Sequence, residues 1–141
     1  MRTFALHGPH ATGHEQQVAD ALTTYGFGCR LTEKMAHHDI DVTKDGRPYA
    51  LVEVKGRRME WGQYPTIHVS ETKILRCLER AAATGVAFLF AVVCDTGIFV
   101  ANLSAKAVAD LPRKRGGRSD RGLAHDIETL IDIPIRAFIK L

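Results

Sequence analysis

The stretch from His38 to Lys55 carries the acidic and basic side chains that could do chemistry together. It reads HDIDVTKDGRPYALVEVK, with Asp39 and Asp41 near its start and Glu53 and Lys55 at its end. Strand residues two apart point to the same face, so each pair is expected to emerge on one side of its strand. The Asp-Gly pair between them predicts a β-hairpin. We therefore expect three carboxylates and an amine to converge.

Carboxylate oxygens favour a hard divalent cation, and the sequence lacks the histidine and cysteine spacing of a zinc site. Such an ion can lower the pKa of a bound water and polarise a phosphoryl oxygen. A lysine beside it can neutralise charge on the phosphorus centre or orient the attacking water. Asp39, Glu53 and Lys55 thus fit metal-assisted phosphodiester hydrolysis. The competing interpretation is a surface hairpin with an ordinary Glu/Lys pair.

The first helix is predicted over residues 13–25, because apolar residues including Val18 and Leu22 recur at helical spacing before a glycine. Glu15 has two interpretations. With Thr12 it fits a capping box, in which a hydroxyl and a carboxylate satisfy free amides reciprocally. Glu15 also lies on or beside the core-facing stripe, where a carboxylate needs a partner such as a cation.

The strands of the sheet follow from shorter patterns. A first strand is predicted over residues 27–35, before the hairpin, whose second strand is nearly all apolar and suits burial on both faces. The continuous apolar run 86–94 predicts a buried central strand, and residues 97–103 are expected to pair with it.

A second helix is predicted over residues 70–84, with Ser70 as its N-cap. Lys73 lies in its first turn, where a cation opposes the helix dipole. That position indicates either a carboxylate or anionic partner for Lys73 or an ordinary solvated surface lysine.

The last third of the chain is predicted as a short helix over 105–111 that Pro112 ends, and then a mobile basic loop over 113–121. Five of the nine loop residues are Lys or Arg. A terminal helix is expected over 123–131, and a final strand or helix over 133–141.

Basic residues in two segments are candidate contacts to a phosphate backbone. They are Arg57, Arg58, Arg113, Lys114 and Arg115. The first segment also contains Trp61 and Tyr64, which could stack on bases or simply anchor a loop. The second could equally be a solubilising surface loop. A net charge of +3 permits a polyanionic partner without requiring one.

Length and composition predict one domain over residues 1–141, since 141 residues with 45% hydrophobic content can build a single core. No apolar run approaches the roughly 20 residues that cross a bilayer, and no signal peptide is recognised, so we expect an intracellular, cytoplasmic protein without membrane association. Three cysteines without a CxxC pair predict neither disulfides nor a cysteine zinc site.

In its order of motifs the sequence resembles the PD-(D/E)XK nuclease superfamily, which includes restriction enzymes, archaeal Holliday junction resolvases and phage nucleases. GHEQQVADALTTYGF matches the family's first helix, HDIDV and VEVKG match its hairpin, and SETK matches its second helix. The resemblance runs from Glu15 to the strand at Val86, about half of the chain. His38 stands where the motif's name puts proline.

The resemblance implies an α/β, restriction endonuclease-like fold, with a central mixed sheet of four to five strands flanked by helices. It implies a Mg²⁺-dependent DNA nuclease in which Mn²⁺ can substitute. The implied metal ligands are Asp39, Glu53, the Val54 carbonyl and Glu15, with Lys55 positioning or activating water and Lys73 supporting the site or touching phosphate. Asp39 is favoured as the strand-opening ligand, and Asp41 stays open as a second ligand or a neighbour.

DNA is the implied partner, in repair, recombination or phage genome processing, in a bacterial or phage-infected host cell. Resolvase-like action on two strands would favour a homodimer. The alternative is a non-catalytic nucleic-acid-binding or assembly protein that retains the nuclease fold. The paired histidines His37 and His38 invite a different metal-site interpretation, but no HNH-like or zinc-finger pattern accompanies them.

Overall fold

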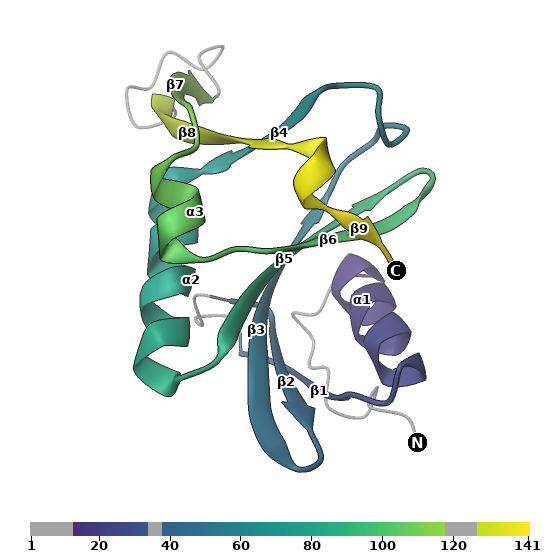
Figure 1. Ribbon diagram of the computed structural model, residues 1–141. Helices are drawn as coiled ribbons and strands as arrows, with labels where there is room; N and C mark the ends of the chain where they lie inside the picture. The colour runs from purple at the N-terminus through teal and green to yellow at the C-terminus, as the bar shows by residue number, and fades with distance from the viewer. Residues whose placement is uncertain (1–12, 34–37, 118–126) are drawn as a thin grey trace.

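A six-stranded mixed sheet forms the centre of the protein, in the strand order β1-β2-β3-β5-β6-β9 (Figure 1). The computed structural model describes residues 13–33, 38–117 and 127–141. The elements in these ranges are α1 (Gly13–Thr24), β1 (Gly28–Leu31), β2 (Ile40–Lys44), β3 (Arg47–Gly56), β4 (Thr66–Ser70), α2 (Glu71–Thr84), β5 (Ala87–Cys94), β6 (Gly97–Asn102), α3 (Ala105–Ala109), β7 (Arg113–Gly117), β8 (Ile127–Pro134), the 3₁₀ helix η3 (Ile135–Ala137) and β9 (Ile139–Lys140).

The hairpin and a parallel crossover define the middle of this sheet. β2 and β3 are antiparallel and join at Asp45 and Gly46, whose φ angles of 52° and 78° match the two left-handed residues of a type I′ turn. β3 pairs in parallel with β5, and α2 lies on the crossover between them. This arrangement confirms the predicted Asp-Gly hairpin and the buried central strand at residues 87–94.

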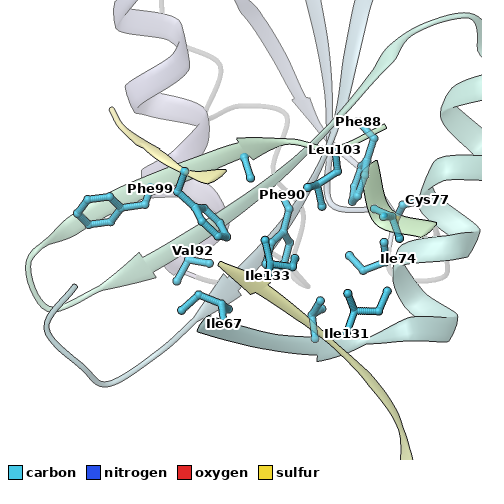
Figure 2. Packing of buried hydrophobic residues seen from close by; sticks show 14 of the residues in the cluster. Ile67, Ile74, Cys77, Phe88, Phe90, Val92, Phe99, Leu103, Ile131 and Ile133 are labelled. Atoms are coloured by element: carbon cyan, nitrogen blue, oxygen red, sulfur yellow. The ribbon is translucent and has the colours of Figure 1, made fainter. Parts of the chain in front are cut away.

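The two faces of the sheet are covered differently. α1 packs on one face, and α2 lies on the opposite side of β3 and β5 (Figure 1). A second, antiparallel sheet, in the order β4-β8-β7, joins α2 on that face. Its buried residues Ile131 and Ile133 pack with Ile74 of α2 and with Phe88 and Phe90 of β5, as Figure 2 shows. Alternate residues of β3 therefore contact different cores.

The predicted helices agree closely with α1 and α2. Ser70 caps α2 through a hydrogen bond accepted from the Lys73 amide, and Gly85 ends the helix in the left-handed region with φ 72°. The mixed α/β, restriction endonuclease-like class is confirmed. The central sheet has six strands in the described ranges, whereas the resemblance implied four or five. None of the helices in these ranges is long and apolar enough to cross a membrane.

Two expectations for the last third of the chain were wrong, and one earlier strand was not predicted. The predicted helix at 123–131 is instead strand β8 where the structure describes it, from Ile127. Residues 113–117 of the predicted mobile loop form β7, and the rest of that loop lies outside the described residues. Residues 66–70 had no predicted strand but form β4.

β8 forms a strand and not the predicted helix because buried and less buried residues alternate along it. Ile131 and Ile133 are buried and Asp132 between them is not, which is the period of a strand covered on one face. β8 contains three isoleucines and Thr129, all β-branched residues, which favour a strand over a helix. β7 pairs with β8 over residues 113–117, and Gly116 lies against the Leu130 side chain, whose Cδ1 would be 2.6 Å from an added Cβ.

Candidate active site

Asp39 is fixed beside β3 by its own backbone and side chain. Its amide donates to the Val52 carbonyl at 2.8 Å, and its carboxylate accepts from the Val54 amide, also at 2.8 Å. These two bonds extend the β2–β3 pairing by one residue and hold Asp39 opposite Glu53. Because β3 is a central strand, the position of the Asp39 carboxylate is set by the rigid part of the fold.

Glu53 is a charged residue inside the core. Its side chain is only 2% exposed, and its Oε2 forms an ion pair with the Lys73 Nζ at 2.8 Å. Its other oxygen, Oε1, is buried and has no hydrogen-bond donor among the described residues. Since buried carboxylate oxygens are normally satisfied, this oxygen requires either a proton or a cation.

The surroundings of Glu53 raise its pKa to about 7. Burial is the largest cause, and the negative charge of Asp39 and a hydrogen bond between the two carboxyl groups act in the same direction, against the ion pair with Lys73. Burial alone would lower the pKa of Lys73, but its hydrogen bond and charge interaction with Glu53, together with the charge of Asp39, leave that pKa raised. Lys73 therefore stays charged at neutral pH.

Lys55 shares the α2-facing side of β3 with Glu53, two residues along the strand. Its pKa is lowered by burial first and then by the charges of Arg57 and Lys73, with Glu53 and Glu128 opposing. A lysine with a lowered pKa loses its proton more readily than an exposed lysine does, so its neutral amine is more available to act as a base. The site thus combines two adjacent carboxylates with two amines of different proton affinity.

The donor set fits a hard divalent cation. Asp39 and Glu53 supply carboxylate oxygens, one of which lacks a donor, and oxygen ligands of this kind suit Mg²⁺ or Mn²⁺. Within the described residues, no group of three or more His, Cys, Asp or Glu side chains is arranged to hold a metal ion. A cation between these two carboxylates would need further oxygens, such as a backbone carbonyl or water.

Glu15 lies in the first turn of α1, which packs against the same end of β3. The contact is close at Gly56, where a Cβ would overlap the His14 imidazole. The start of α1 therefore lies beside the end of β3, at Gly56. The capping partner expected for Glu15, Thr12, lies outside the described residues.

Asp41 binds other side chains and is not paired with Asp39 or Glu53. Its carboxylate binds the Arg30 guanidinium and the His38 Nε2, each at 2.6 Å. The hydrogen bond from His38 is the largest cause of a lowered Asp41 pKa. These residues line a cavity of about 610 Å³ between the β1–β3 hairpin region and the end of α2, near Arg80 and Thr84. The Asp41 carboxylate is therefore bound by Arg30 and His38, whereas Asp39 lies opposite Glu53.

The candidate phosphate contacts divide into two groups. The Arg57 guanidinium donates to the carbonyls of Gly56 and His68, and so ties the end of β3 to β4. The Arg113 guanidinium donates to the carbonyls of Val108 and Leu111 and to the Glu71 carboxylate. Both arginines are thus bound within the fold. Arg58, Lys114 and Arg115 are exposed.

Replacing Arg113 with alanine is expected to lower the free energy of unfolding by about 2–3 kcal/mol, because two carbonyls and a carboxylate lose a charged donor. Urea unfolding of the purified variant would measure this. The matched control is Arg115→Ala on the exposed part of the same strand, with an expected change within about 0.5 kcal/mol. Equal effects of the two substitutions would contradict the structural role of Arg113.

The structure also decides between the two interpretations of the aromatic segment. The Trp61 ring stacks on Phe99 with centroids 4.1 Å apart and meets the Phe138 ring edge to face. Trp61 is therefore an anchor for the loop after β3, whereas Tyr64 is 52% exposed. Sequence reasoning gave no role to His68, whose ring bonds Asp132 and Lys114. The strand alternation of residues 66–70 was the signal that could have placed it.

Solved structures include one with the same fold. Hjc from Archaeoglobus fulgidus, a Holliday junction resolvase from an archaeal hyperthermophile, superposes with a TM-score of 0.63 at 14% sequence identity. The match covers 91% of this chain and 88% of that chain. At this identity the likeness establishes the fold alone. A search of curated proteins found no match.

A family model described as "Phage putative PDDEXK endonuclease" matches residues 11–141. The matched region includes both carboxylates, both lysines and every described element of the fold. It also extends beyond β5, where the resemblance recognised from the motifs ended. With nearly the whole sequence matched, the chain belongs to this family of phage PD-(D/E)XK endonucleases.

Proposed function

We propose that the protein is a divalent-metal-dependent deoxyribonuclease that hydrolyses phosphodiester bonds at the site formed by Asp39, Glu53 and Lys55. The observation that carries the proposal is Glu53, a core carboxylate with one oxygen bound by Lys73 and the other without a donor in the described part of the chain. Burial of Glu53 beside a second carboxylate, Asp39, is unfavourable for the fold by itself. Binding of a catalytic cation by Asp39 and Glu53 would explain why the two carboxylates lie together.

The ligands proposed for Mg²⁺ are Asp39, Glu53, the Val54 carbonyl and Glu15, with Mn²⁺ as a substitute. When bound, the ion supplies a Lewis acid for the phosphoryl oxygen and lowers the pKa of a coordinated water. Glu15 is included because α1 begins beside the end of β3. Asp41 is the weaker candidate, since Arg30 and His38 already bind both of its oxygens.

The two lysines have different proposed roles. Lys55, with its lowered pKa, orients the attacking water and accepts its proton as the oxygen attacks phosphorus. Lys73 stays charged and keeps Glu53 in place before the cation binds. Its side chain is half-exposed, which leaves it able to contact a phosphate oxygen of the substrate. This division follows from the opposite pKa shifts of the two amines.

DNA is the proposed substrate, in recombination, repair or phage genome processing. The family description names endonucleases of phages, and the similar solved structure is a Holliday junction resolvase, which makes branched DNA a substrate to test. Arg58 and Arg115, two of the residues that we expected to contact the phosphate backbone, are exposed and available for such contacts. Fold alone does not determine the substrate.

The test is a cleavage assay with linear duplex, single-stranded, flapped and four-way DNA, each with Mg²⁺, Mn²⁺ or EDTA. We expect cleavage of at least one substrate with either metal and none with EDTA. Binding of DNA without cleavage of any substrate would favour the non-catalytic nucleic-acid-binding alternative. Paired cuts across the four-way junction would indicate a dimer with two-fold symmetry.

A further inference from the structure

The outer face of the β4-β8-β7 sheet carries a short chain of polar side chains outside the carboxylate site. His68 of β4 and Asp132 of β8 are directly opposite in the antiparallel register. Lys114 of β7 lies on the neighbouring strand, with its Nζ 2.9 Å from the His68 Nε2 and 4.0 Å from the Asp132 Oδ1. The residues beside them, Ile67 and Ile133, point inward to the core.

The order of donors in this chain can be assigned. A lysine ammonium only donates, so the His68 Nε2 must accept from Lys114. The His68 Nδ1 then carries the proton and donates to Asp132. Asp132 thereby fixes the tautomer of His68, and His68 fixes the direction of the Lys114 ammonium.

This arrangement contributes little to folding. The side chains of His68 and Lys114 are each 44% exposed, and exposed polar pairs typically stabilise a protein by less than about 1 kcal/mol. What it does provide is orientation, because one N–H of Lys114 is used and the others remain for a ligand. A side chain ordered in advance loses less entropy when it binds an anion.

The chain is linked to the carboxylate site through Arg57. The Arg57 guanidinium donates to the His68 carbonyl at 2.9 Å, and Arg57 follows Lys55 by two residues at the end of β3. Lys55, Arg57 and Lys114 therefore form a basic path from the carboxylates onto the outer face of the second sheet.

We propose that Lys114 binds a backbone phosphate of the DNA away from the cleaved bond, and that His68 is the positioning residue that orients it. The proposal rests on the proposed nuclease function. It identifies the surface along which the bound DNA backbone extends away from the catalytic centre. The ligand chemistry is a phosphodiester oxygen, which the two remaining N–H donors of the Lys114 ammonium can bind without reading base sequence.

The first experiment measures DNA affinity by fluorescence anisotropy in EDTA, between 50 and 200 mM salt, for the wild type and Lys114→Ala. Loss of one phosphate contact should reduce the slope of log K against log salt by about 0.9 for duplex DNA and about 0.7 for single strands, or about eightfold in affinity near 100 mM salt. The control is Lys44→Ala, at the hairpin end of β2 next to the start of β3. Its slope should match the wild type.

The second experiment tests the positioning role of His68. His68→Ala should weaken binding about two- to tenfold through lost preorganisation, and the same substitution in a Lys114→Ala background should have no further effect. His68→Gln, whose amide can donate to Asp132 and accept from Lys114, should retain most of the affinity. Additive effects of the two alanine substitutions would overturn the positioning role.

The outcomes separate this proposal from the function on which it rests. Cleavage of DNA by the wild type, together with an unchanged salt slope for Lys114→Ala, would overturn the phosphate contact and leave the nuclease function standing. A wild type that neither binds nor cleaves DNA would overturn both. Unfolding curves of each variant would show whether any loss of affinity comes from loss of the fold.

Discussion

Glu53→Gln is expected to reduce metal-dependent cleavage by about a thousandfold or more. A glutamine cannot supply the anionic oxygen proposed as a metal ligand, and metal-borne charge stabilisation contributes several kcal/mol to such reactions, with a factor of ten for each 1.4 kcal/mol. Single-turnover cleavage with Mg²⁺ and with Mn²⁺ would measure the loss. Retention of more than about a tenth of the wild-type rate would contradict the ligand role.

The same substitution should change how stability depends on pH. Glu53 has a pKa of about 7 in the folded, metal-free protein, against an ordinary value of 4.5. Between these values the folded state binds more protons than the unfolded state, so stability falls as pH rises through this window and levels off above about pH 7. The total is about 3 kcal/mol. Because glutamine does not titrate, the stability of the variant should not fall through this pH window.

Urea unfolding in EDTA from pH 4.5 to 8 would measure that difference. The free energy of unfolding of Glu53→Gln, relative to the wild type, is expected to rise by about 3 kcal/mol across the range. Glu79→Gln, on an exposed position of α2, is the matched control and should stay parallel to the wild type. Parallel curves for Glu53→Gln as well would show that burial and Asp39 do not raise its pKa.

Lys55→Ala is expected to lower the cleavage rate by about 10²–10⁴-fold, the range for loss of a group that transfers a proton, with little change in DNA affinity. The reason is that Lys55 combines a lowered pKa with a position two residues from Glu53 on one face of β3. Single-turnover rates and anisotropy would separate the chemical step from binding. Lys106→Ala, on an exposed position of α3, serves as the charge-matched control.

A second substitution at Lys55 distinguishes charge from proton transfer. Arginine keeps the positive charge but does not release its proton in proteins. If Lys55 accepts a proton from water, Lys55→Arg should lose nearly as much activity as Lys55→Ala. Recovery of wild-type activity with arginine would reduce the role of Lys55 to charge stabilisation.

The sequence by itself determined the local elements that carry the carboxylates. The Asp-Gly pair required a tight turn, the apolar second strand required burial, and Ser70 with Gly85 set both ends of α2. These signals depend on residues close together in the sequence, so they can be recognised without knowing which elements pack against one another. The order of the motifs also identified the family, which the match over residues 11–141 confirms.

Only the tertiary structure decided which charges meet. Asp39 and Asp41 are two residues apart, but backbone bonds to Val52 and Val54 hold the first beside Glu53, while Arg30 and His38 bind the second. Sequence spacing predicts a shared face and not the partners across strands.

The same limit applies to the basic residues. Arg113 and Lys114 are neighbours in one run, but the first is bound to carbonyls and to Glu71, and the second reaches His68 on another sheet strand. The contacts with Glu71 and His68 join residues more than 40 positions apart. The pairing depends on the β4-β8-β7 sheet, in which a charged, glycine-containing segment is a strand because β8 beside it supplies the backbone hydrogen bonds.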